Sequence, residues 1–140
     1  MHIRPIALAV VRRDNDLLVF RGEDPDSAAP VYFRPLGGGI DFGETAEEAL
    51  RREFVEELGA SLGSVQLLGV LENRFELAGV PGHEIVFVFA AELADAVELP
   101  AVVADTGEAV SWEPMDKFVS GAATLYPEGL VTLLDQPKRR

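Results

Sequence analysis

The sequence predicts a single α/β domain in which helices cover a mixed β-sheet. The chain has 140 residues, which suits one hydrophobic core better than two. Segments typical of strands outnumber those typical of helices, and one strong helix stands in the middle of the chain. Residues 85–90 form a continuous apolar run, which is typical of a strand that is buried on both faces.

The strands are predicted from apolar stretches that end at turn-forming residues. The polar turn Arg13-Asp14-Asn15 joins the first two, and a loop rich in Asp, Pro, Ser and Ala follows at residues 22–30. Four glycines within residues 35–43 predict a second loop. The predicted strands are residues 3–12, 16–21, 31–34, 64–73, 84–92 and 109–113.

The central helix is predicted over residues 45–58. Thr45 and Glu48 have the spacing of a capping box, in which each side chain binds the backbone of the other residue. Gly59 stands where a glycine commonly ends a helix. A short helix is expected at residues 114–119, a terminal helix at 128–136, and a frayed basic tail at 137–140.

The charge of the chain limits its partners. There are 24 acidic and 12 basic residues, a formal net charge of −12, which repels nucleic acids and anionic membrane surfaces. A small phosphorylated ligand would need a divalent metal or a local basic patch. The absence of cysteine excludes disulfides and thiolate chemistry and suits a reducing compartment. The early apolar stretch at residues 6–11 is too short for a membrane span, so the expected location is the cytoplasm.

Three acidic residues of the central helix share one side. At about 100° per residue, Glu53, Glu56 and Glu57 lie within the apolar sector or along its border. Most acidic helix residues belong to a solvated face, but here that face holds Glu48, Arg51 and Val55. The apolar sector consists of Ala46, Ala49, Leu50, Phe54 and Leu58.

Clustered, inward-facing carboxylates repel one another and lose hydration, and a divalent cation removes both penalties. Carboxylate oxygens suit hard ions such as Mg²⁺ or Mn²⁺. Arg52 precedes Glu53 and lies four residues before Glu56, so it can pair with either carboxylate and hold its side chain in place. A metal site is therefore favoured over a solvated face.

The glycines ahead of this helix fit the same interpretation. Gly37, Gly38 and Gly39 allow backbone groups to approach a ligand, and a carbonyl there can bind a metal. A tight turn would explain three glycines equally well. Their place before an acidic helix favours a pocket for a metal-bound pyrophosphate.

This stretch resembles a known motif. Gly38, then five residues, Glu44, then seven residues and Arg52-Glu53-Phe54-Val55-Glu56-Glu57-Leu58-Gly59-Ala60 resemble the Nudix box of the Nudix hydrolase superfamily. The resemblance implies an α/β/α sandwich with a mixed sheet over residues 1–140, with the box at 38–60. It also implies hydrolysis of a nucleoside diphosphate linked to another group. Leu36 and Ala60 depart from the commonest pattern, but both are packing positions.

The resemblance also implies roles for individual residues. Glu53, Glu56 and Glu57 would bind Mg²⁺, with Mn²⁺ as a substitute, and Gly38 would offer its carbonyl. Glu44 would lie near the metal. Such ions neutralise phosphate oxygens and acidify a bound water, whose proton a carboxylate must accept. Glu53 is the candidate base in the box. Glu108, ahead of Trp112, is the candidate in a distal loop, and it reads equally well as an ordinary loop acid.

The substrate contacts are less constrained by the sequence. Arg34 and Arg74 are predicted at strand ends, where they could bind phosphate, although each is also typical of a surface arginine. Gly37 lets the backbone approach the substrate, and His83 opens the apolar strand. These four residues are the candidate substrate-binding residues. Arg52 is counted with Glu53 and Glu108 among the candidate catalytic residues because it would orient the carboxylates.

The sequence thus favours an enzyme, a Mg²⁺-dependent Nudix-type pyrophosphohydrolase that acts on a small nucleotide or nucleotide-sugar substrate. One alternative is a non-catalytic Nudix-like module that binds a nucleotide, which would not need all three carboxylates. Another is a structural or interaction domain with an acidic helix, which the inward placement of the acids disfavours. No nucleic-acid or membrane partner is expected, and a homodimer is compatible with the sequence. Markers of particular Nudix subfamilies are missing outside the box, so the nucleoside remains open.

Overall fold

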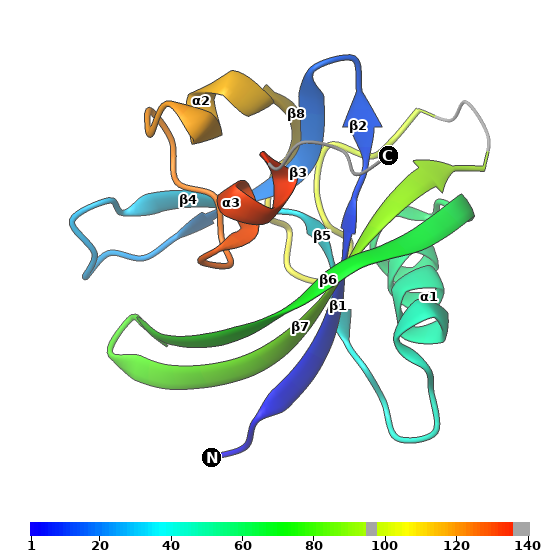
Figure 1. Cartoon of the computed structure of the whole chain (residues 1–140), viewed down its shortest axis with the longest axis horizontal. Helices are drawn as coiled ribbons and strands as arrows, with labels where there is room; N and C mark the ends of the chain where they lie inside the picture. Colours follow the sequence, from blue (N-terminus) through cyan, green and yellow to red (C-terminus); the bar gives the residue numbers. More distant parts are fainter. Residues whose placement is uncertain (95–97, 136–140) are drawn as a thin grey trace.

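The computed structural model describes residues 1–94 and 98–135, and its elements follow the predicted order (Figure 1). The predicted basic tail at 137–140 and the last residue of the predicted terminal helix lie outside the described residues. The strands are β1 (Arg4–Val10), β2 (Arg12–Arg13), β3 (Asp16–Glu23), β4 (Val31–Arg34), β5 (Leu36–Gly39), β6 (Leu62–Leu77), β7 (Val80–Leu93) and β8 (Val110–Pro114). The helices are α1 (Ala46–Leu58), α2 (Met115–Val119) and α3 (Leu130–Leu134).

The larger sheet is mixed, as the sequence predicts. Its strand order is β5-β1-β7-β6; β1 runs parallel to β7, and the other neighbours are antiparallel. A second sheet has the order β2-β3-β4, with β8 paired to β3. Helix α1 lies on one side of the mixed sheet, and α2 and α3 lie on the other (Figure 1).

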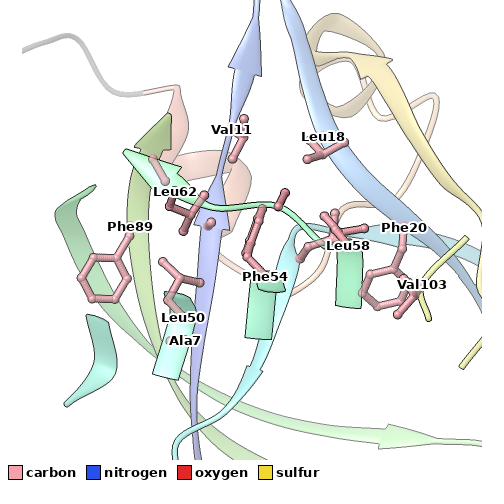
Figure 2. Close-up of a cluster of buried hydrophobic side chains, with 14 of the residues drawn as sticks. Ala7, Val11, Leu18, Phe20, Leu50, Phe54, Leu58, Leu62, Phe89 and Val103 are labelled. Carbon is pink, nitrogen blue, oxygen red and sulfur yellow. The ribbon is translucent and has the colours of Figure 1, made fainter. Parts of the chain in front are cut away.

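Strand β1 shows how the sheet separates two cores. Its successive side chains point to opposite faces, because the side-chain period of a strand is two. Figure 2 shows the core on the α1 side, where Leu50, Phe54 and Leu58 of α1 meet the sheet. The β1 residues in this core are Ala7 and Ala9, whereas Ile6, Leu8 and Val10 belong to the core beneath α2 and α3. The chain therefore forms an α/β/α sandwich.

The apolar run at residues 85–90 is covered on both faces, as predicted. Val86 and Val88 are fully buried in the core beneath α2 and α3. Phe89 is buried in the α1 core, and Phe87 packs against it. Central strand β7 thus carries apolar side chains into both layers.

The prediction of a loop over residues 35–43 is wrong for its first half. Residues 36–39 form β5, which pairs antiparallel with β1. The glycines permit this pairing: a Cβ on Gly37 would lie 2.0 Å from the carbonyl oxygen of Ala7, and the φ of Gly37 is +148°. Glycine was read as a loop signal, whereas here it allows two backbones to approach closely.

Other boundaries also shift. Strands β6 and β7 extend beyond the predicted ranges and form a long hairpin that turns at Ala78-Gly79. The terminal helix is limited to residues 130–134, shorter than expected. Among the described residues, no helix is both long and apolar enough to cross a membrane.

Candidate active site

Helix α1 begins and ends at the predicted caps. The Thr45 hydroxyl accepts a hydrogen bond from the Glu48 N–H (3.1 Å), and the Glu48 carboxylate accepts one from the Thr45 N–H (2.9 Å). Gly59 ends the helix in the left-handed conformation, at a φ of +64°. These caps fix which α1 side chains face the sheet and which face outward.

The three predicted metal ligands differ in their exposure. The side chain of Glu53 is 14% exposed and that of Glu56 is 58% exposed. Glu57 is half-buried. The structure therefore places Glu53 and Glu57 toward the protein, whereas Glu56, which was predicted on the same side, is exposed to solvent.

Strand β5 leaves space for the carboxylate of Glu53. A Cβ added to Gly38 would lie 2.5 Å from Cδ of Glu53 and less than 3 Å from both of its carboxylate oxygens. Only a residue without a side chain leaves this space to the carboxylate. The structure thus brings together Gly38 and Glu53, which the sequence predicts to share a metal site.

Arg52 links α1 to the segment that precedes it. Its guanidinium donates two hydrogen bonds to Glu44 (2.7 and 2.8 Å) and one each to Glu53 (3.0 Å) and Glu56 (3.2 Å). It also donates to the carbonyl oxygen of Gly39 (3.0 Å). Arg52 thereby orients both carboxylates that it was predicted to pair with.

The pairing with Arg52 also changes the acidity of Glu44. Hydrogen bonds from Arg52 and from the backbone N–H of Asp41 lower the pKa of Glu44 to about 2. The hydrogen bonds from Arg52 to Glu44 and to Glu53 raise the pKa of Arg52. Both groups therefore remain charged over the physiological pH range, and the link between α1 and the preceding segment persists with them.

Glu57 carries a carboxylate oxygen without a hydrogen-bond partner. Its Oε2 is buried and has no hydrogen-bond partner. Burial raises the pKa of Glu57, and the negative charges of Glu53 and Asp105 raise it further. A buried carboxylate oxygen without a partner is costly, and a bound cation would satisfy it.

The residues of this site fit a divalent cation chemically. They supply hard carboxylate oxygens, the unpartnered oxygen of Glu57 and the space that Gly38 leaves for Glu53. Within the described part of the chain, no three acidic or histidine side chains are already gathered around one point that could hold a metal. The guanidinium of Arg52 pairs with Glu53 and with Glu56.

The distal loop containing Glu108 lies against the end of α1. The N–H of Ala104 donates to the backbone carbonyl oxygen of Glu57 (3.0 Å), and buried Val103 anchors the loop in the core. The carboxylate of Glu108 accepts a hydrogen bond from the Thr106 hydroxyl (2.8 Å). Its charge contributes to the raised pKa of Glu57. Glu108 is thus placed on the same side as the α1 carboxylates.

Arg34 lies in a cavity of about 410 Å³ between β4 and the mixed sheet. Its Nε is buried and has no hydrogen-bond partner. Burial lowers the pKa of Arg34, and the carboxylate of Glu84 opposes this shift. Arg74 on β6 lines the same cavity from its exposed side. The structure therefore brings the two predicted phosphate-binding arginines together.

The other two predicted substrate contacts are placed differently. His83 is opposite Arg74 in the β6–β7 pairing and lines another hollow, of about 830 Å³, beside the start of the chain. Gly37 faces the backbone of β1. The structure does not bring either residue to the cavity lined by Arg34.

Sequence reasoning missed four residues that line the Arg34 cavity. Arg4, Glu84 and Asn73 are aligned across β1, β7 and β6, and Tyr126 comes from the loop before α3. One signal was available in the sequence, since Glu84 is a charged residue directly before the apolar run of β7. The alignment itself depends on strand register, which the sequence does not reveal.

Strand β5 and helix α1 carry the residues that resemble the Nudix box, and they do so within an α/β/α sandwich. The NUDIX domain family matches residues 2–133, so the chain belongs to this family. Among curated proteins, the chain is similar to the nucleoside triphosphatase NudI of Escherichia coli O139:H28 (strain E24377A / ETEC), with 39% identity over 62 residues. That match spans 44% of the chain and 44% of NudI, less than half of either protein.

Solved structures share the fold over nearly the whole chain. A NUDIX hydrolase from Nitrosomonas europaea superposes with a TM-score of 0.70 at 21% identity, over 96% of this chain and 87% of that one. A MutT NUDIX hydrolase from Burkholderia pseudomallei gives a TM-score of 0.69 at 25% identity, over 99% and 100%. The mixed-sheet sandwich predicted from the sequence is thus confirmed.

Proposed function

We propose that the protein is a Mg²⁺-dependent hydrolase that cleaves a phosphoanhydride bond in a nucleoside triphosphate or in another nucleoside diphosphate derivative. The observation that carries this proposal is the buried, unpartnered oxygen of Glu57 beside Glu53, whose carboxylate fits against Gly38. The family of the chain and the printed activity of its relative NudI support the reaction class.

Glu53, Glu56, Glu57 and the carbonyl of Gly38 would hold the cation, with Mn²⁺ as a substitute for Mg²⁺. The bound cation supplies charge neutralisation at the phosphate oxygens and makes an attacking water more acidic. Arg52 holds Glu53 and Glu56 in position through its hydrogen bonds to both carboxylates. Its bidentate pairing with Glu44 fixes the guanidinium itself.

Water attacks phosphorus, so that a new P–O bond forms and the anhydride P–O bond breaks. We propose that Glu108 accepts the proton of this water, because it lies on the side of Glu57 and is held by Thr106. Glu53 is the alternative base. The leaving phosphate departs as an anion, whose charge the arginines of the cavity would stabilise.

Arg34 and Arg74 are proposed to bind the phosphate groups of the substrate. Arg34 is a half-buried cation whose Nε lacks a partner, so an anion would compensate for its loss of hydration. On a chain with a net charge of −12, such a local positive site would help the metal to attract phosphate. Gly37 keeps β5 close to β1, and His83 would contact only a substrate that extends along β7.

The proposal is tested with a panel of nucleoside triphosphates and nucleotide sugars, incubated with Mg²⁺, with Mn²⁺ or with a chelator. Phosphorus NMR identifies the products. Metal-dependent release of phosphate or pyrophosphate is the expected result. Binding without turnover at any metal concentration would contradict it and would indicate a non-catalytic nucleotide-binding module. A cytoplasmic location and a homodimer remain predictions from the sequence.

A further inference from the structure

Two buried polar side chains lack a hydrogen bond within the described part of the chain. Among the described residues, the buried polar or charged ones are Asp24, Asn73 and Glu84. Asp24 accepts hydrogen bonds from the N–H groups of Asp26 (3.3 Å) and Ala78 (3.2 Å), so its burial is explained by the fold. Within the same part of the chain, Asn73 and Glu84 form no side-chain hydrogen bond. Their polar atoms are accessible from the cavity that both residues line, so a ligand there can pair with them.

The charge of Glu84 is compensated by Arg4 and by Arg34, but neither cation hydrogen-bonds to its carboxylate. Its side chain is 9% exposed, and its ion pair with Arg4 is 3.8 Å long, which exceeds a hydrogen bond. The Arg4 side chain is 65% exposed and remains hydrated. A purely structural ion pair at this depth would have hydrogen bonds on the carboxylate. Glu84 instead has two acceptor oxygens free for a ligand.

Asn73 and Glu84 are adjacent in space and line one cavity. They are paired residues of β6 and β7, and both line the cavity of about 410 Å³ that contains Arg34. Tyr32 and Tyr126 line this cavity as well, with their ring centroids 4.9 Å apart. A cavity of this size that combines aromatic surface with a few unpaired polar groups suits a flat, polar heterocycle.

We propose, on the basis of the proposed function, that Glu84 and Asn73 bind the polar edge of the substrate's nucleobase and make the enzyme selective for guanine nucleotides. A carboxylate offers two neighbouring acceptors. Guanine is the common base with two neighbouring N–H donors on its pairing edge, from the ring N1 and the 2-amino group. The Asn73 amide then donates to the adjacent O6.

The other bases leave part of this site unpaired. Adenine and cytosine offer an amino group beside a ring nitrogen acceptor, and uracil and thymine offer one N–H between two carbonyl oxygens. Each would give Glu84 at most one donor and would place an acceptor against its second oxygen. A site that leaves a buried charged group unpaired rejects such analogues strongly, by roughly a hundredfold or more.

The first experiment measures nucleoside binding by calorimetry in the absence of metal. Guanosine, adenosine, cytidine and uridine have no phosphate, so this experiment does not depend on hydrolysis. Guanosine should bind at least tenfold more tightly than the other three. Glu84→Gln should remove most of this preference. Glu72→Gln, a change of the same charge at an exposed position of β6, is the matched control and should retain it.

The second experiment compares kcat/KM for the four nucleoside triphosphates in the same variants. A fall in kcat/KM for guanosine triphosphate in Glu84→Gln to the level of the other three nucleotides supports the proposal. Equal binding of all nucleosides by the wild type, or an unchanged preference in Glu84→Gln, overturns it. If Glu84→Gln does not fold, Asn73→Ala provides the same comparison. Selective guanosine binding without any turnover would refute the proposed function alone, whereas turnover of all four nucleotides with equal kcat/KM would refute only the selectivity.

Discussion

The three consecutive glycines of β5 should respond very differently to the same substitution. In Gly38→Ala, the new Cβ would lie 2.5 Å from Cδ of Glu53, and ordinary contact begins at 3.4 Å, so the carboxyl group must move by about 0.9 Å. Gly38 does not have a positive φ, so the backbone tolerates alanine. A misplacement of about 1 Å in a catalytic group can cost roughly a hundredfold in rate. Gly38→Ala should therefore fold but lose most of its activity.

The neighbouring glycines provide the controls. In Gly37→Ala the Cβ would lie 2.0 Å from the backbone oxygen of Ala7, at a φ of +148°, so the β5–β1 pairing should fail. In Gly39→Ala the nearest atom is Nη2 of Arg4 at 3.5 Å, which is ordinary contact. Gly37→Ala should thus lose stability, and Gly39→Ala should resemble the wild type in stability and rate.

Thermal melting and kcat at saturating Mg²⁺, measured for all three variants, separate these effects. The expected pattern is a loss of fold for Gly37→Ala, a loss of rate alone for Gly38→Ala, and neither for Gly39→Ala. A wild-type rate in Gly38→Ala would refute the fit between Gly38 and Glu53. A Gly38→Ala variant as unstable as Gly37→Ala would show that the position serves the fold and not the site.

Three further predictions concern the charged groups. Mg²⁺ or Mn²⁺ should raise the melting temperature above that measured with chelator, because the ion binds only the folded protein. At a metal concentration of a hundred times Kd, the expected stabilisation is about 2.7 kcal/mol. No shift at millimolar metal would count against a metal site in the free enzyme. Because the pKa of Glu44 falls from 4.5 to about 2 on folding, its pairing with Arg52 stabilises the fold above pH 4.5 and ceases to do so as the pH falls through 2. Glu44→Gln should therefore lower the urea midpoint at pH 7 but progressively less toward pH 2, and an equal loss at both pH values would contradict this. Glu108→Gln should lower the maximal rate with little change in the dependence of the rate on Mg²⁺ concentration, whereas Glu53→Gln should change the maximal rate and the Mg²⁺ dependence. A wild-type rate in Glu108→Gln would assign the base to Glu53 or to another loop acid such as Asp105.

Local signals in the sequence predicted the central helix and its acidic side. The capping box of Thr45 and Glu48 and the terminal Gly59 act within a few residues, so their effect does not depend on the rest of the fold. The positions of Glu53 and Glu57 follow from the helical period once the caps are set. The mixed sheet was expected because segments typical of strands outnumber those typical of helices, and the family resemblance implied it as well.

Features that depend on strand register could not be predicted in this way. Strand β5 was read as a loop because glycine favours both loops and close backbone contacts, and only the pairing with β1 distinguishes them. Arg34 is 39 residues before Asn73, which is 11 residues before Glu84, and the three meet only when β4, β6 and β7 are placed. The pairing of Arg52 with Glu44 was missed for the same reason, because the chain must turn back at the start of α1.

The role of α1 as the metal-binding helix is tested most directly by the rate of nucleoside triphosphate hydrolysis in Glu57→Gln at saturating Mg²⁺. Glu47→Gln removes the same charge from an exposed position of the helix and serves as the control. The rate of Glu57→Gln should fall by about a hundredfold or more, because an anionic ligand of the cation is lost. A rate close to that of Glu47→Gln and the wild type would contradict a metal site at Glu57.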